Sequence, residues 1–315
     1  MNLVWDREML ILLGGIVALL ALSSLVGLVL ARRVQTESGR AVVDNLNARI
    51  RSWWVMTAVF VAALASGGVG SVVLFALISF VALREFVTLT PTRRADHRTL
   101  FWAFFVFAPV QYILVGVQWY GLFVIFIPVY AFLFVPVRSV LAGDTEDFLA
   151  RTAKIQWGLM VAVYCVSHAP ALLMLEIPGY EGQQAKLLLF LIVVAQLSDV
   201  LQYAFGKTLG KHRIVPRVSP NKTWEGALGG IAGASLVGAL LWWATPFAPW
   251  AAGAIALLVC LLGFAGGLVM SAIKRDRGIK DFGTLIEGHG GVMDRIDSLC
   301  FAAPVFFHVV RYFYV

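Results

Sequence analysis

The chain has 315 residues, of which 60% are hydrophobic and only 14% are charged, whereas soluble domains are about 25% charged. This composition excludes a soluble globular protein, and the apolar residues fall in blocks long enough to cross about 30 Å of hydrocarbon as helices. The net charge of +7 does not indicate a nucleic-acid partner, because the positive residues follow the pattern of membrane topology.

In chain order, apolar runs predict ten membrane spans. They lie at 9–30, 53–66, 69–89, 100–116, 120–137, 155–175, 186–206, 226–244, 251–270 and 298–314. Arg32 and Arg33 follow the first run, which indicates a retained helix with its N-terminus outside rather than a cleaved signal. Only Ser66-Gly67-Gly68 separates the second and third runs, so a single kinked or re-entrant element is an alternative there. The expected fold class is all-α, a polytopic integral membrane protein of about ten transmembrane helices with cytoplasmic catalytic loops.

Five polar connections carry most of the positive charge. They lie at 31–52, 90–99, 138–154, 207–225 and 271–297, and they hold 21 of the 25 Lys and Arg residues. Because positive residues stay on the cytoplasmic side, we expect these connections to face the cytoplasm of a bacterial inner membrane. We expect one membrane domain, 1–315, in which 1–180 are less specific N-terminal helices and 186–315 form the catalytic region. Cys165, Cys260 and Cys300 lie in apolar spans and are expected to be small core residues.

The connection at 207–225 forms a basic strip. It contains Lys207, Lys211, Arg213, Arg217 and Lys222, with no acidic residue before Glu225. Such a strip would attract polyphosphate, since each cation can hydrogen-bond phosphate oxygens. A helix should follow, capped by Ser219, Asn221 or Thr223, with its free N–H groups offered to an anion. The alternative is a basic loop that only fixes topology.

The segment 271–298 mixes cations with carboxylates. It contains Lys274, Arg275, Arg277, Lys280 and Arg295 together with Asp276, Asp281, Asp294 and Asp297. Such a set suits a site for both phosphate and a divalent cation, because Mg²⁺ prefers a few carboxylates plus phosphate oxygens. Asp294 and Asp297 are three residues apart and would share one face of a helix. The glycines around His289 would let the backbone approach a ligand, and the alternative is a salt-bridged surface hairpin.

A third feature is Asp199, which interrupts the apolar run 187–205. A carboxylate at that depth costs about 2.5 to 3.5 kcal/mol, so it should face a polar cavity or a cation. Gln202 and Tyr203, one turn closer to the cytoplasm, could line the same cavity. The alternative is a structural hydrogen bond between helices. His97, His168, His212 and His308 show no metal-ligand spacing, and the sequence contains no GxSxG elbow, Walker loop or HExxH.

These motifs together resemble a known family. The pattern Ser271, Lys274-Arg275, Lys280-Asp281, Gly283, Ile286, Gly288-His289-Gly290-Gly291 and Asp294-Arg295-Ile296-Asp297 closely resembles the C-terminal signature of the CDP-diacylglycerol synthases, or phosphatidate cytidylyltransferases. Ser219-Pro220 with Lys222-Thr223-Trp224-Glu225-Gly226, and Asp199 with Phe205-Gly206-Lys207, resemble two further stretches of that family. The resemblance covers roughly 196–301. Glu287 and Val200-Leu201-Gln202-Tyr203 depart from the family pattern and put the substrate identity in doubt.

The resemblance implies transfer of CMP from CTP to phosphatidate, giving CDP-diacylglycerol and pyrophosphate in phospholipid biosynthesis. It implies Mg²⁺, with a second cation as an option, held by Asp199, Asp281, Asp294 and Asp297. The expected phosphate-binding residues are Lys222, Lys274, Arg275, Lys280 and Arg295. Ser219, Ser271 and His289 are expected to orient ligands. Of these, the predicted catalytic set is Asp199, Lys222, Asp281, His289, Asp294 and Asp297.

Three other functions remain open from the sequence. The first keeps the chemistry but uses another lipid phosphate as acceptor, and the second is a CTP-dependent lipid kinase that releases CDP. The third is a non-catalytic lipid-binding or transport protein. A transporter should place polar residues along several spans, whereas here they lie mainly in cytoplasmic connections. The partners expected are CTP, a lipid phosphate and membrane lipids, and a homodimer is left open.

Overall fold

The computed structural model describes residues 5–90 and 92–315. Within these ranges, nine helical segments are long and apolar enough to cross a membrane. They are α1 (Arg7–Arg33), α2 (Glu37–Ala65), α3 (Gly67–Thr88), Arg94–Gly116, Tyr120–Val140, Phe148–Met174, α10 (Gln184–Leu209), α12 (Pro249–Asp276) and α13 (Met293–Tyr314). A further helix, α11 (Trp224–Leu240), has 17 residues, or about 25 Å of length, and takes the place of the predicted span at 226–244. The all-helical membrane fold is therefore confirmed.

Three of the segments are composite. Arg94–Gly116 consists of η1 (Arg94–Asp96), α4 (His97–Trp102), η2 (Ala103–Phe107) and α5 (Ala108–Gly116). Tyr120–Val140 consists of α6 (Tyr120–Ile125), η3 (Phe126–Ala131) and α7 (Phe132–Val140), and Phe148–Met174 of α8 (Phe148–Gly158), η4 (Leu159–Cys165), α9 (Val166–Ala171) and η5 (Leu172–Met174). Because η2, η3 and η4 are π-helical, each of these spans contains a widened turn near its middle.

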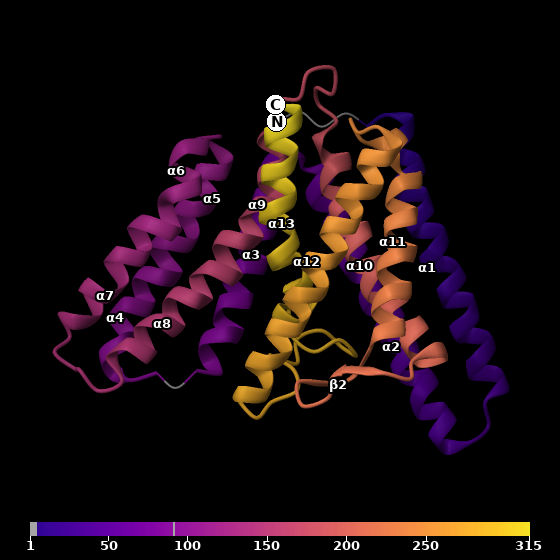
Figure 1. Cartoon of the computed structure of the whole chain (residues 1–315), viewed down its shortest axis with the longest axis horizontal. Coiled ribbons are helices and arrows are strands. Elements are labelled where there is room, and N and C mark those ends of the chain that lie inside the picture. The colour runs from indigo at the N-terminus through magenta and orange to yellow at the C-terminus, as the bar shows by residue number, and fades with distance from the viewer. Residues whose placement is uncertain (1–4, 91) are drawn as a thin grey trace.

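Successive helices run alternately between two ends of the bundle, and the start of α1 and the end of α13 lie at the same end (Figure 1). The connections after α10 and α12 both lie at the opposite end, which we call the loop end. The expectation that these two polar connections share one side is therefore confirmed. In the same view, α4 to α8 lie on one side of α13, and α10, α11 and α1 lie on the other.

The region 31–66 differs from its prediction. α2 begins at Glu37, so most of the expected connection at 31–52 is helical and that boundary was wrong. Its first half is polar but free of proline, and the Thr36 hydroxyl accepts a hydrogen bond from the Gly39 N–H, so the helix starts well before the apolar run. α2 and α3 are separate helices that meet at Ser66, where Gly67 has a positive φ of 79°.

The fold contains one small departure from all-α structure. Strands β1 (Arg213–Val215) and β2 (Ser219–Thr223) pair as an antiparallel hairpin, with Arg213 opposite Thr223. The chain then enters α11, and the Thr223 hydroxyl accepts a hydrogen bond from the Gly226 N–H at 3.2 Å. Thr223 is thus the cap among the three predicted candidates. A short helix, η6 (Trp242–Ala244), follows α11.

Glycines bring α10 to α13 close together. A Cβ atom at Gly230 of α11 would lie 2.4 Å from Cγ of Gln202 on α10, and one at Gly266 of α12 would lie 2.7 Å from the Asp297 carbonyl oxygen on α13. Helices without side chains at these points can approach until their backbones nearly touch. This packing carries the polar residues of α10 and α13 toward one another.

Candidate active site

A polar cavity of about 260 Å³ opens at the loop end, between α10, the β1–β2 hairpin, α12 and α13. Half of the twelve predicted site residues line it, namely Asp199, Lys222, Ser271, Asp294, Arg295 and Asp297. Gln202 and Tyr203 line it as well, as predicted. Drug-sized ligands occupy roughly 300 to 1,000 Å³, so this cavity suits phosphate groups and a cation rather than a whole nucleotide and lipid.

Two carboxylates face this cavity from different helices. Asp199 comes from α10 and Asp297 from α13. Asp199 interacts electrostatically with Asp297, Lys222 and Arg295. Neither carboxylate forms an ion pair with any residue that the structure describes. Two carboxylates that share a cavity repel one another and neither is held in an ion pair, so their arrangement favours a metal cation between or beside them.

Lys222 brings a positive charge to the same cavity from β2. Its Nζ lies 4.8 Å from the centre of the Phe264 ring, and a Cβ atom at Gly267 would come within 2.9 Å of it. Burial lowers the pKa of Lys222, while Asp199 and Asp297 favour its charged form. The glycine on α12 therefore leaves room for an ammonium group that is partly withdrawn from water.

Asp294 has a role beyond lining the cavity. Its Oδ1 accepts a hydrogen bond from Lys274 Nζ at 2.8 Å, and its Oδ2 accepts from the backbone N–H groups of Phe282 at 2.7 Å and Gly291 at 3.0 Å. Asp294 thereby fastens the loop 277–292 to α13. A Cβ atom at Gly290, where φ is +84°, would lie 2.9 Å from Asp294 Oδ2, so glycine is required there.

Glu85 on α3 is a site residue that the sequence analysis missed. Its two carboxylate oxygens accept hydrogen bonds from the backbone N–H groups of Val292 at 3.0 Å and Met293 at 2.8 Å. It thus caps the first turn of α13 from a distant part of the chain. The available signal was an acidic residue within the apolar run 69–89, the same signal that identified Asp199.

The remaining predicted cations and hydroxyls near the loop end have mixed surroundings. Arg275 donates from Nε to the Val218 carbonyl at 3.2 Å and from Nη1 to the Ile279 carbonyl at 2.7 Å, so it joins the hairpin to the loop. The Ser271 hydroxyl donates to the Gly267 carbonyl at 2.6 Å. Of these residues only Ser271 lines the cavity. Ser219 is half-buried at the start of β2, Lys280 and Asp281 are exposed on the loop, and neither Lys274 nor Arg275 lines the cavity. Their ligand-binding roles stay predictions.

His289 is buried between the loop and α2 and does not line the cavity. Its Nε2 lies 3.3 Å from the Arg49 carbonyl oxygen, and its ring meets the edge of the Trp53 ring. Burial, and then the charge of Arg295, lower the pKa of His289 to about 4, so the imidazole is neutral near pH 7 and its Nε2 is the donor to this carbonyl. Its predicted ligand-orienting role would have to act through the loop.

Glu287, the departure from the family pattern, points toward α2. Its carboxylate forms an ion pair with Arg51 at 3.3 Å, and its carbonyl accepts a hydrogen bond from the Ser52 hydroxyl at 2.8 Å. Both charged side chains are about two-thirds exposed. Glu287 therefore places its negative charge on the α2 side of the loop rather than in the cavity.

The donor set of the cavity fits a magnesium ion. No three His, Cys, Asp or Glu side chains converge as a ready metal site within residues 5–90 and 92–315. Mg²⁺ characteristically binds through one or two carboxylates and takes its other ligands from water and substrate phosphates. Asp199 and Asp297 are two carboxylates of the kind that this coordination requires.

The cavity also has free capacity for an anion. The buried Arg295 Nε has no hydrogen-bond partner in the part of the chain that the structure describes. Arg295 lines the cavity beside Asp297, and its backbone carbonyl accepts a hydrogen bond from Gln196 Nε2 at 3.2 Å. A buried guanidinium with an unused donor is suited to a phosphate oxygen.

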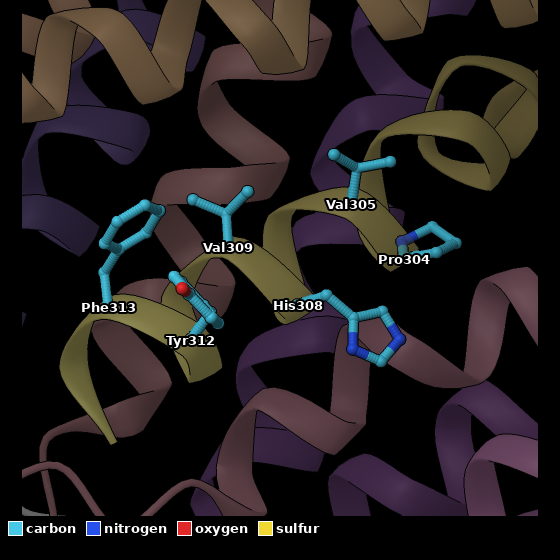
Figure 2. Close-up of a pocket in the computed structure, with 6 residues that line it drawn as sticks. All are labelled: Pro304, Val305, His308, Val309, Tyr312 and Phe313. Carbon is cyan, nitrogen blue, oxygen red and sulfur yellow. The ribbon is translucent and has the colours of Figure 1, made fainter.

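A larger hollow of about 460 Å³ lies on the second half of α13. Figure 2 shows its lining, Pro304, Val305, His308, Val309, Tyr312 and Phe313, all from that one helix. This surface is almost wholly apolar and includes none of the predicted site residues. It has the character of a lipid-facing surface, and we assign the chemistry to the smaller polar cavity.

Comparisons with known proteins agree with this assignment. The model of the cytidylyltransferase family matches residues 47–313. The "uncharacterized protein YnbB" of Escherichia coli (strain K12) is 40% identical over 304 residues, which are 95% of this chain and 97% of that protein. A phosphatidate cytidylyltransferase of Staphylococcus aureus (strain COL) is 28% identical over 78% of this chain and 92% of its own length. One of Brucella abortus biovar 1 (strain 9-941) is 43% identical, over 38% of this chain and 45% of its own length.

Proposed function

The chain belongs to the cytidylyltransferase family, and we propose that it transfers CMP from CTP to a membrane lipid phosphate, with phosphatidate as the acceptor. The product would be CDP-diacylglycerol, with release of pyrophosphate. The observation that carries this proposal is the convergence of Asp199, Asp297, Lys222 and Arg295 in one cavity at the loop end. Such a cavity offers charge neutralisation to phosphates and sites for a cation in the same small space.

The proposed reaction needs no covalent intermediate on the protein. An oxygen of the lipid phosphate attacks the α-phosphorus of CTP, the new P–O bond forms, and the bond to the oxygen bridging to the β-phosphorus breaks as pyrophosphate leaves. We assign Lys222 and Arg295 to the phosphate oxygens, where their charges offset the negative charge of the two reactants. Neither residue has to give or take a proton in this step.

We assign the cofactor Mg²⁺ to Asp199 and Asp297, with the Ser298 hydroxyl beside Asp199. Bound there, the ion would neutralise charge on the triphosphate and polarise the phosphoryl group under attack. The protein's part is to hold the two carboxylates at fixed positions on α10 and α13 and to bring Lys222 in from β2.

Topology supports a cytoplasmic active site in a bacterial inner membrane. The chain is an integral membrane protein, and its loop end holds the connections that are rich in Lys and Arg. Positive connections mark the cytoplasmic side, where CTP is available. A cavity at this end lets a soluble nucleotide meet a lipid headgroup at the membrane surface.

The test is an assay of the purified protein in detergent with α-³²P CTP, Mg²⁺ and phosphatidate. Label should enter the organic phase in a magnesium-dependent way, with one pyrophosphate released for each labelled lipid. A parallel reaction with γ-³²P CTP separates the lipid kinase, which would label the lipid from the γ-position and release CDP. A panel of lysolipid and isoprenoid phosphates then tests the acceptor, and absence of transfer to every acceptor from folded protein would refute the proposal.

A further inference from the structure

The strongest feature outside the cavity is the contact between Glu85 and the start of α13. Both carboxylate oxygens are used, and each accepts from one backbone N–H, at 3.0 Å and 2.8 Å. α3 and α13 also pack directly against one another. A charged acceptor at a helix N-terminus is bound by charge-assisted hydrogen bonds and by the helix dipole, so this contact is a firm one.

The loop is shaped to admit this carboxylate. A Cβ atom at Gly283 would lie 2.6 Å from Glu85 Oε1, and one at Gly291 would lie 2.4 Å from Glu85 Oε2. Two glycines of the signature therefore make room for Glu85 rather than for a ligand. Of these two, Gly291 is one of the glycines around His289 that were predicted to let the backbone approach a ligand.

Glu85 and Asp294 together occupy four backbone donors of the loop and of the first turn of α13. Asp294 takes the N–H groups of Phe282 and Gly291, and Glu85 takes the next two along the chain. These four N–H groups are consequently not available to phosphate. Among the cavity's cations, Arg295 lies on α13, so its position depends on how the start of α13 is held.

We propose that Glu85 is a positioning residue for the transfer reaction. It fixes the first turn of α13 and thereby sets where Asp294, Arg295 and Asp297 stand in the cavity. Glu85 itself does not line the cavity, so it acts through α13 and the loop. This inference rests on the proposed function, and it makes the N-terminal helices part of the machinery that prepares the site.

The experiment compares the wild type with Glu85→Gln and with Arg84→Gln as a matched control. Glutamine keeps the size of the side chain but has one acceptor oxygen, so its NH₂ group would oppose the second backbone N–H. Arg84 is the neighbouring exposed residue on α3 and should tolerate the same change. Each protein is treated with trypsin in detergent, and cleavage after Arg277 and Lys280 in the loop is followed by mass spectrometry.

We expect loop cleavage in Glu85→Gln to be about tenfold faster or more, since loss of a charge-assisted hydrogen bond favours local opening by that factor. We also expect kcat to fall about tenfold or more, with the KM for CTP within about twofold of wild type and the melting temperature nearly unchanged. Arg84→Gln should match wild type in all four measurements.

Cleavage at the wild-type rate in Glu85→Gln would overturn the inference, and so would faster cleavage with unchanged kcat. Should Glu85→Gln unfold as a whole, Glu85→Asp provides the second variant, because it keeps the charge and should recover part of kcat. Wild-type protein that transfers nothing would overturn the proposed function, whatever the cleavage rates. The cleavage measurement needs no turnover, so the two failures can be told apart.

Discussion

Replacing Asp294 and Asp297 separately by Asn should have different consequences for stability. Asp294 is 4% exposed and accepts hydrogen bonds from Lys274, Phe282 and Gly291. In Asp294→Asn, the best rotamer keeps its oxygen on the two backbone N–H groups and turns its NH₂ toward Lys274 Nζ. That change removes a buried ion pair at 2.8 Å and leaves two donors facing each other.

The cost of Asp294→Asn should be about 2 to 4 kcal/mol of unfolding free energy. Asp297→Asn loses no ion pair that the structure describes, and the asparagine oxygen can still accept from the Ser298 N–H at 2.8 Å, so its stability should stay within about 0.5 kcal/mol of wild type. Both variants should lose activity on the order of 100-fold or more, because each loses a charge in the cavity.

The assay is thermal unfolding of the detergent-purified variants, followed by tryptophan fluorescence, beside the α-³²P transfer assay. Asp294→Asn should melt several degrees below wild type, whereas Asp297→Asn should melt at the wild-type temperature. Equal melting temperatures for all three proteins would refute the anchoring role of Asp294. Full activity in Asp297→Asn would refute its assignment to the cation.

Three further predictions follow from the cavity and its surroundings. Lys222→Met should raise the KM for CTP about 10- to 100-fold without lowering the melting temperature, as measured by transfer at varied CTP; an unchanged KM would remove Lys222 from phosphate binding. Gly230→Ala should cost about 1 to 3 kcal/mol by forcing α10 and α11 apart, whereas Gly15→Ala, with nothing within 4 Å, should be neutral in the same melt. Because the pKa of His289 is about 4 in the fold and about 6.5 unfolded, its stabilising effect should be complete above pH 6.5 and decline as the pH falls toward 4. The melting temperature of His289→Gln should therefore fall less steeply than that of wild type as the pH is lowered over that range. Parallel curves of melting temperature against pH for the two proteins would contradict the lowered pKa of His289.

The sequence by itself determined the membrane fold, and half of the site residues predicted from it line the cavity. Runs of apolar residues leave no alternative to spanning helices, because backbone groups in lipid must be satisfied within the helix. Asp199 could be singled out since an intramembrane carboxylate is costly unless it faces a polar space. Lys222, Arg295 and Asp297 followed from charge patterns in the two long connections and from the family signature.

Only the tertiary structure decided which of the predicted residues meet. His289 turns to α2, Glu287 pairs with Arg51, and the glycines of the loop admit Glu85 from α3. These are contacts between residues about 200 or more positions apart in the chain, and they depend on which helices pack together at the loop end. Local spacing carries no information about such packing, because many helix arrangements satisfy the same apolar periodicity. The start of α2 at Glu37 was not predicted for a related reason. The first half of this helix is polar, so it does not appear as an apolar run in the sequence.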